Sequence, residues 1–139
     1  MRTRSLATVT AVAAFAVLLP LAAAFAAGAK TPEERLLGTW REEQEFGGDP
    51  NRPVEKRPFV EFKKGTYVHT YPATGGKPME GKWSVASAKG DELVLKMTLQ
   101  LDPKTAFPVD DQKIVFKDAD TFEMRNAKNG HGGVYKRLK

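Results

Sequence analysis

Apolar and polar residues alternate along much of the chain after residue 39, most regularly over residues 92–101. One parity in that segment is entirely apolar and consists of Leu93, Leu95, Met97, Leu99 and Leu101. A period of two residues is typical of a β-strand with one face on a hydrophobic core. An α-helix would instead spread these side chains around its circumference. We therefore predict a strand over residues 92–101.

Weaker alternation predicts seven further strands, at residues 40–46, 59–63, 66–71, 79–85, 114–116, 122–124 and 133–138. Segments rich in residues that favour turns separate several of them, at residues 47–53, 72–78, 89–91, 102–108, 118–120 and 129–133. Residues 47–53 contain two prolines and two glycines, which do not fit within a ladder. No linker-like composition interrupts residues 30–139, so we interpret them as one domain.

A short helix is predicted ahead of the first strand, over residues 32–37. Thr31 is a favourable N-cap, Pro32 suits the first helical position, and Glu34 completes a capping box. Gly38 can end the helix. This is the one helix that the pattern predicts.

Eight short strands in sequential antiparallel order have two economical arrangements. An up-and-down barrel removes exposed edges by closing on itself, whereas a two-sheet sandwich usually needs Greek-key crossovers. The short hairpins favour the barrel. We therefore predict an all-β fold, a small antiparallel up-and-down β-barrel of about eight strands preceded by a short N-terminal helix. The residues expected to face its interior are Trp40, Phe46, Val60, Phe62, Met79, Trp83, Val85, Leu93, Leu95, Met97, Leu99, Ile114, Phe116, Phe122 and Met124.

Residues 1–29 have the organisation of a signal peptide. Two arginines precede an uncharged stretch over residues 5–29, which Pro20 interrupts and which ends in two A-x-A sites. We expect cleavage between Ala26 and Lys30 and an extracytoplasmic protein, either periplasmic or secreted. An uncleaved anchor is the competing interpretation, because 25 uncharged residues can span a bilayer. In that case this segment would be the membrane contact.

Composition and charge exclude several kinds of functional site. The chain has no cysteine, which excludes disulfides, thiolate metal sites and a cysteine nucleophile. The net charge of +5 falls to +3 without the two arginines of the signal peptide, and the remaining basic residues are scattered. A nucleic-acid partner usually requires a concentrated basic face, so we expect none.

Catalytic motifs are also missing. The serines beyond the signal peptide, Ser84 and Ser87, lie outside any G-x-S-x-G motif. His69 has no partner at a metal-binding spacing, and His131 lies in a glycine-rich turn. We therefore expect no enzymatic activity, no catalytic residue, no bound metal and no cofactor.

Several short motifs occur in an order that resembles a known family. They are Gly38-Thr39-Trp40, Phe62-Lys63-Lys64-Gly65-Thr66-Tyr67, Gly81-Lys82-Trp83-Ser84-Val85, Asp91-Glu92-Leu93-Val94-Leu95 and Val134-Tyr135-Lys136-Arg137. Together they resemble the small secreted lipocalin-like domains of bacteria, whose broader relatives are the calycin barrels. The resemblance covers residues 36–137.

The resemblance implies a structural role for the first tryptophan. In lipocalins the tryptophan of the G-x-W motif lies at the closed end of the barrel, and an arginine from a late strand stacks on it. Trp40 would take that place in this chain, with Arg137 or Arg125 as its partner. Ligand-carrying lipocalins are typically longer than this chain, and the difference favours an interior filled by side chains.

An eight-stranded barrel is either filled by its own side chains or holds one small ligand. The large residues predicted to point inward favour the filled barrel. A ligand cavity requires polar groups that point inward, and Glu42 and Gln44 share the parity of Trp40. These two residues are therefore candidate ligand-binding residues.

Tyr67, His69 and Tyr71 are further candidates, and their direction depends on one turn. A two-residue turn pairs Phe62 with Tyr67 and directs the three side chains inward. A three-residue turn with a bulge pairs Phe62 with Thr66 and turns His69 outward, because a slip of one residue exchanges the two faces of a strand. The sequence leaves both registers open.

Two classes of function remain. The first is an exported binding barrel that takes a small amphiphilic molecule. The second is a module that interacts with an extracytoplasmic protein, because the size and the short leading segment also resemble secreted bacterial metalloprotease inhibitors. In such inhibitors an N-terminal trunk enters the enzyme cleft, and residues 30–37 would be that trunk.

Overall fold

The computed structural model describes residues 29–139, so the predicted signal peptide lies outside the described residues apart from Ala29. A short helix, α1 (Pro32–Leu36), precedes eight strands. The strands are β1 (Gly38–Glu45), β2 (Phe59–Lys63), β3 (Thr66–Thr70), β4 (Met79–Lys89), β5 (Glu92–Asp102), β6 (Thr105–Asp118), β7 (Thr121–Asn126) and β8 (Gly132–Arg137). Two 3₁₀ turns, η1 (Val54–Lys56) and η2 (Pro72–Thr74), lie in the loops after β1 and β3.

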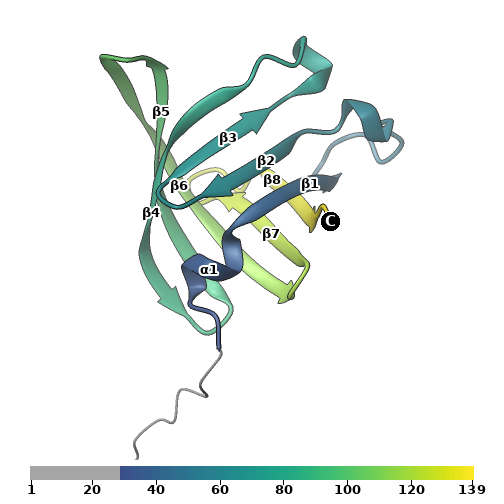
Figure 1. Cartoon of the computed structure of the whole chain (residues 1–139). Coiled ribbons are helices and arrows are strands. Elements are labelled where there is room, and N and C mark those ends of the chain that lie inside the picture. Colours follow the sequence, from purple (N-terminus) through teal and green to yellow (C-terminus); the bar gives the residue numbers. More distant parts are fainter. Residues whose placement is uncertain (1–28) are drawn as a thin grey trace, which may run out of the picture.

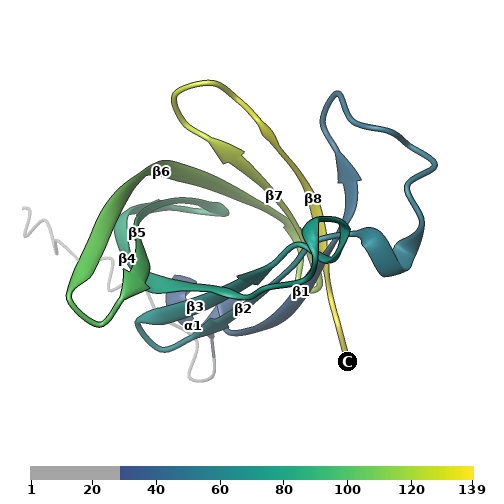
Figure 2. The same cartoon turned by 90° about the horizontal axis from the view of Figure 1, so that it is seen from above.

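The strands form a closed barrel, and each one pairs antiparallel with the next along the chain (Figures 1 and 2). β1 closes the barrel by pairing with β8, where Trp40 lies opposite Arg137. The predicted up-and-down barrel of eight strands is therefore confirmed, and the sandwich is excluded. Within residues 29–139, no helix is long and apolar enough to cross a membrane.

The core follows the predicted inward parity in the closed half of the barrel. It consists of Leu36, Trp40, Val60, Phe62, Tyr67, Trp83, Leu93, Leu95, Met97, Ile114, Phe116, Phe122, Met124 and Tyr135. The predicted strand over residues 92–101 supplies three of these residues in its first half. The strand predicted from the alternation in that segment is therefore confirmed.

Three strands extend beyond the barrel, which corrects part of the predicted core. β4, β5 and β6 are 11, 11 and 14 residues long, whereas the other strands have 5 to 8. The turn end of the β5–β6 hairpin projects from the barrel as a flared arm (Figure 1). Leu101 lies on that arm and is exposed. Met79, which pairs with His69 at the start of β4, is exposed as well and does not belong to the core. Residues 105–108, predicted as part of a loop, belong to β6 because the turn after Asp102 has only two residues.

Arg137 and Trp40 close one end of the barrel. The guanidinium carbon of Arg137 lies 4.0 Å from the centroid of the Trp40 ring. The indole nitrogen of Trp40 donates a hydrogen bond of 2.8 Å to the carbonyl of Leu36. Arg125, the other candidate, lies over the ring of Phe46 instead. Of the two candidate arginines, Arg137 is therefore the one that stacks on Trp40.

The helix α1 is fixed to this closed end. Thr31 forms the predicted capping box with Glu34, and Leu36 is completely buried. Arg137 donates hydrogen bonds of 2.6 Å and 2.8 Å to the carbonyls of Leu37 and Arg35. The carbonyls at the end of a short helix thus receive donors from the last strand. Residues 30–37 are therefore part of the barrel's closed end and not an extended trunk.

Gly38 explains why the first motif begins with glycine. Its backbone adopts a φ of 119°, which residues with a Cβ atom rarely adopt. A Cβ atom at this position would also lie 2.8 Å from the Nη1 atom of Arg137. Glycine therefore allows the chain to turn from α1 into β1 underneath the arginine.

The first prediction concerns the closed end. Trp40→Ala should lower the free energy of unfolding by about 3–5 kcal/mol, because it removes a fully buried aromatic ring and leaves a cavity. Urea denaturation measures this loss. Lys96→Ala is the control: its exposed ion pair with Asp111 should contribute less than about 1 kcal/mol. A loss below 1 kcal/mol for Trp40→Ala would contradict the role at the closed end.

Candidate functional site

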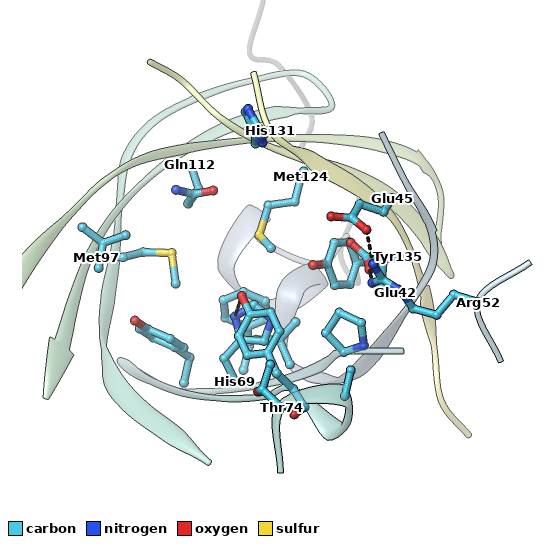
Figure 3. A pocket seen from close by; sticks show the side chains of 18 of the residues that line it. Glu42, Glu45, Arg52, His69, Thr74, Met97, Gln112, Met124, His131 and Tyr135 are labelled. Carbon is cyan, nitrogen blue, oxygen red and sulfur yellow. Dashed lines mark hydrogen bonds and ion pairs between the residues drawn. The ribbon is translucent and has the colours of Figure 1, made fainter. Parts of the chain in front are cut away.

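A cavity of about 420 Å³ occupies the end of the barrel opposite α1 (Figure 3). Its base is formed by core residues such as Val60, Phe62 and Met124, and its rim by the loops that contain η1, η2 and His131. The lining residues are Glu42, Glu45, Arg52, Lys56, Pro58, Val60, Phe62, Tyr67, His69, Tyr71, Ala73, Thr74, Met97, Val109, Gln112, Met124, His131, Gly132 and Tyr135. The barrel is thus filled in its closed half and hollow in its open half.

Glu42 is a buried acid in the cavity wall. It points inward as its parity with Trp40 predicts, and only 6% of the residue is exposed. Burial raises the pKa of its carboxyl, and the charge of Glu45 raises it further. Arg52, a hydrogen bond with Tyr135 and Arg57 act in the opposite direction on this pKa.

Gln44 does not point into the cavity as Glu42 does, so the prediction that Gln44 faces the interior is wrong. A β-bulge lies between Glu42 and Gln44 in the pairing of β1 with β8. A bulge places two residues opposite one and exchanges the faces of the strand beyond it. Gln44 is therefore exposed and absent from the cavity lining, and Glu45 lines the cavity instead.

Arg52 comes from the loop between β1 and β2 and connects the two carboxylates. Its Nη2 atom forms an ion pair and hydrogen bond with Glu45. Its Nη1 atom lies 3.6 Å from the Oε2 atom of Glu42. Figure 3 shows Arg52, Glu42, Glu45 and Tyr135 together on one side of the cavity. Two carboxylates therefore share one guanidinium.

The turn between β2 and β3 settles the direction of Tyr67 and His69. Phe62 pairs with Tyr67 and Lys63 with Thr66, which leaves a two-residue turn. Tyr67 is buried, and both Tyr67 and His69 line the cavity, as does the partly exposed Tyr71. Of the two registers that the sequence allowed, the chain adopts the one that brings these side chains into the cavity.

His69 is held in a weakly polar environment. Its ring centroid lies 4.3 Å from that of Tyr71, and its Nδ1 atom lies 3.3 Å from the Tyr71 hydroxyl. Its Nε2 atom is buried and has no hydrogen-bond partner among the described residues. Burial lowers the pKa of His69 from 6.5 to about 4, because the charged imidazolium is disfavoured there. The imidazole is therefore neutral near pH 7.

Two glycines make room for the inward polar side chains. A Cβ atom at Gly133 would lie 2.6 Å from the Oε1 atom of Glu42. A Cβ atom at Gly81 would lie 2.6 Å from the Cε1 atom of the Tyr67 ring. Both glycines lie directly across the ladder from β1 or β3. A side chain at either position would displace a residue of the cavity wall.

Tyr135, Glu45 and Arg52 belong to the site but were not among the predicted site residues. Tyr135 is 3% exposed, and burial raises the pKa of its hydroxyl well above 10, with the Glu42 carboxylate as the next cause. Alternation with Gly133 and Arg137 could have assigned Tyr135 to the inner face. The position of Glu45 in the cavity depends on a bulge, and that of Arg52 depends on the path of a loop. Neither feature can be detected from the alternation of apolar and polar residues.

A metal centre is not formed by these residues. Within residues 29–139, no group of three or more histidine, aspartate or glutamate side chains is arranged to hold a metal ion.

A separate hollow of about 460 Å³ lies between α1 and the turn of the β2–β3 hairpin. Its polar lining residues, among them Glu33, Glu34 and Lys64, are exposed. The cavity that contains Glu42 is therefore the stronger candidate site.

Comparisons with known proteins add one structural similarity. No protein-family model matches the chain, and no curated protein matches it. Among solved structures, the chain is similar to a lipocalin-like protein from Bacteroides uniformis ATCC 8492. The match has a TM-score of 0.47 and 15% identity, and it covers 75% of this chain and 99% of the other.

The second prediction uses the pKa of His69. Between pH 6.5 and about 4 the unfolded chain binds a proton at His69 that the folded chain does not bind. Stability from this group is therefore complete above pH 6.5 and is lost as the pH falls. Between pH 7 and pH 4.5 the loss should be about 2 kcal/mol. His69→Gln should lose correspondingly less stability than the wild type over the same interval.

Urea denaturation at the two pH values measures this difference. His131→Gln is the matched control, because it makes the same substitution at an exposed histidine in the turn before β8. The opposing contribution of Glu42, whose pKa is raised, is common to all three proteins. Equal pH dependence in the wild type and His69→Gln would contradict the buried, neutral imidazole.

Proposed function

We propose that the protein is a binding barrel that holds a small amphiphilic molecule in the cavity at its open end and carries out no catalysis. The observation that carries this proposal is the cavity itself. A volume of about 420 Å³ lies within the range of sites for small molecules, about 300–1,000 Å³. A few polar groups among apolar walls are typical of such sites.

The distribution of polarity supports an amphiphilic ligand. Met97 and Val109, from β5 and β6, provide an apolar wall. Glu42 and Tyr135 provide a polar wall on the opposite side (Figure 3). A ligand with one polar end and one apolar part would contact both walls without burying an unpaired polar group.

The buried Nε2 atom of His69 also supports a ligand with polar atoms. Buried polar atoms in proteins nearly always have a hydrogen-bond partner. This nitrogen belongs to a residue of the cavity lining and has none within the described residues. A polar group of a ligand would satisfy it.

The alternative of an interaction module receives less support. Its trunk would be residues 30–37, but the helix in this segment is bound to the barrel through Leu36 and Arg137. Insertion into an enzyme cleft would require those contacts to break. We also propose that the binding barrel works outside the cytoplasm, because residues 1–29 have the features of a signal peptide.

The third prediction tests binding by native mass spectrometry of residues 30–139 purified gently from the native host. We expect an adduct of a few hundred daltons that disappears on denaturation. Met97→Trp should remove the adduct by filling the apolar side of the cavity, since Met97 lines it. Lys96→Trp, one residue away on the exposed face of β5, is the matched control and should retain it.

Thermal unfolding establishes that both tryptophan variants are folded before their masses are compared. A bare mass for the wild type, or an adduct that persists in a folded Met97→Trp variant, would contradict binding in this cavity.

A further inference from the structure

We propose that the ligand of this cavity is a cationic amphiphile, with an ammonium group beside Glu42 and an apolar chain directed toward β5 and β6. This inference rests on the proposed binding function and specifies the charge and orientation of the ligand. It follows from which charges are buried, which are exposed, and which rings surround them.

The cavity wall contains a buried acid, Glu42. Glu42 is 6% exposed, whereas the cationic residues of the lining, Arg52 and Lys56, lie in the loop between β1 and β2 at the rim. Arg52 is already shared between Glu42 and Glu45. The Glu42 carboxylate would repel an anionic ligand in the interior, whereas it would attract a cationic ligand.

The cationic partner of Glu42 in this structure is distant from its carboxylate. The only ion pair of Glu42 within residues 29–139 is the 3.6 Å contact with the Nη1 atom of Arg52. Direct charge-assisted hydrogen bonds between nitrogen and a carboxylate are shorter, about 2.7–2.9 Å. Glu42 thus has capacity for a closer cation, and the cavity side of the carboxylate is where such a group would approach.

Three tyrosines line the same cavity as Glu42. Tyr67, Tyr71 and Tyr135 all line the cavity and come from β3, the residue after it and β8. Ring faces attract cations, and this attraction is larger where water is excluded. His69 beside them stays neutral near pH 7 and adds no opposing positive charge. The three tyrosines and Glu42 therefore form a surrounding suited to an organic ammonium group.

Apolar side chains continue from the cavity onto the flared arm. Met97 pairs with Val109, and Leu99 pairs with Phe107 at the next inward position along the same strands. The first pair lines the cavity, and the second lies on the flared arm, where Phe107 is 48% exposed. An apolar chain can therefore leave the cavity along a continuous apolar surface. This direction places the polar end of the ligand at Glu42.

The experiment compares three ligands with the same chain and different head groups, namely octylammonium, octan-1-ol and octanoate. Isothermal titration calorimetry at pH 7 and low salt measures their affinities for residues 30–139. We expect octylammonium to bind at least about tenfold more tightly than either other ligand, from one ion pair and the tyrosine rings. The preference should decrease at high salt.

Glu42→Gln tests the assigned partner. It keeps the shape and a hydrogen-bonding group but removes the charge, so the preference for octylammonium over octan-1-ol should fall below about threefold. Glu61→Gln is the matched control, because Glu61 lies on β2, outside the cavity lining, and pairs with Lys63. It should keep the wild-type preference. If Glu42→Gln does not fold, Glu45→Gln should still reduce the preference, since Glu45 adds to the same negative charge.

The outcomes separate this inference from the proposed function. Octanol or octanoate binding as tightly as octylammonium would overturn the cationic head group and leave a binding barrel in place. An unchanged preference in a folded Glu42→Gln variant would overturn the assigned partner. No binding of any of the three ligands, together with a native adduct by mass spectrometry, would overturn the inference alone. No binding together with a bare native mass would overturn both.

Discussion

The guanidinium of Arg137 lies on the indole of Trp40 and donates hydrogen bonds to the last carbonyls of α1. Such a cation–π contact contributes about 0.5–2 kcal/mol, and the charge-assisted hydrogen bonds hold the helix against the barrel. Because β1 and β8 meet at this point, the same residues close the sheet and cover one end of it. The aromatic core lies next to them, which leaves the other end of the barrel to polar side chains and loops.

The open end contains groups that would destabilise a simple hydrophobic core. Glu42 is buried with a distant ion pair, and His69 keeps a buried nitrogen without a partner. Burying such groups costs free energy unless they are paired. Gly133 leaves space for the carboxylate where a larger residue would exclude it. The open half is therefore shaped for polar contacts, whereas the closed half is shaped for stability.

Most of the architecture could be predicted, because period-two alternation reports directly which face of a strand is buried. Leu93 and Leu95 follow it in the core, and the motif containing Trp40 marked the closed end. The site was less predictable for physical reasons. Because of one bulge, Glu45 lines the cavity in place of Gln44. The direction of the His69 side chain depended on whether one turn has two or three residues. Such local irregularities change the face of a side chain without changing the pattern of the chain.

The two ends of the barrel differ: Trp40 and Arg137 close one end, and the other contains the cavity in which we propose that a ligand binds. The most direct test is a titration of ¹⁵N-labelled protein with octylammonium, followed by two-dimensional NMR. We expect the chemical-shift changes to be concentrated at the backbone amides of Glu42, His69 and Tyr135. The chemical shift of the Trp40 indole N–H, which donates a hydrogen bond to the carbonyl of Leu36, should not change. Chemical-shift changes concentrated at the closed end, or spread evenly over the barrel, would contradict ligand binding at the open end.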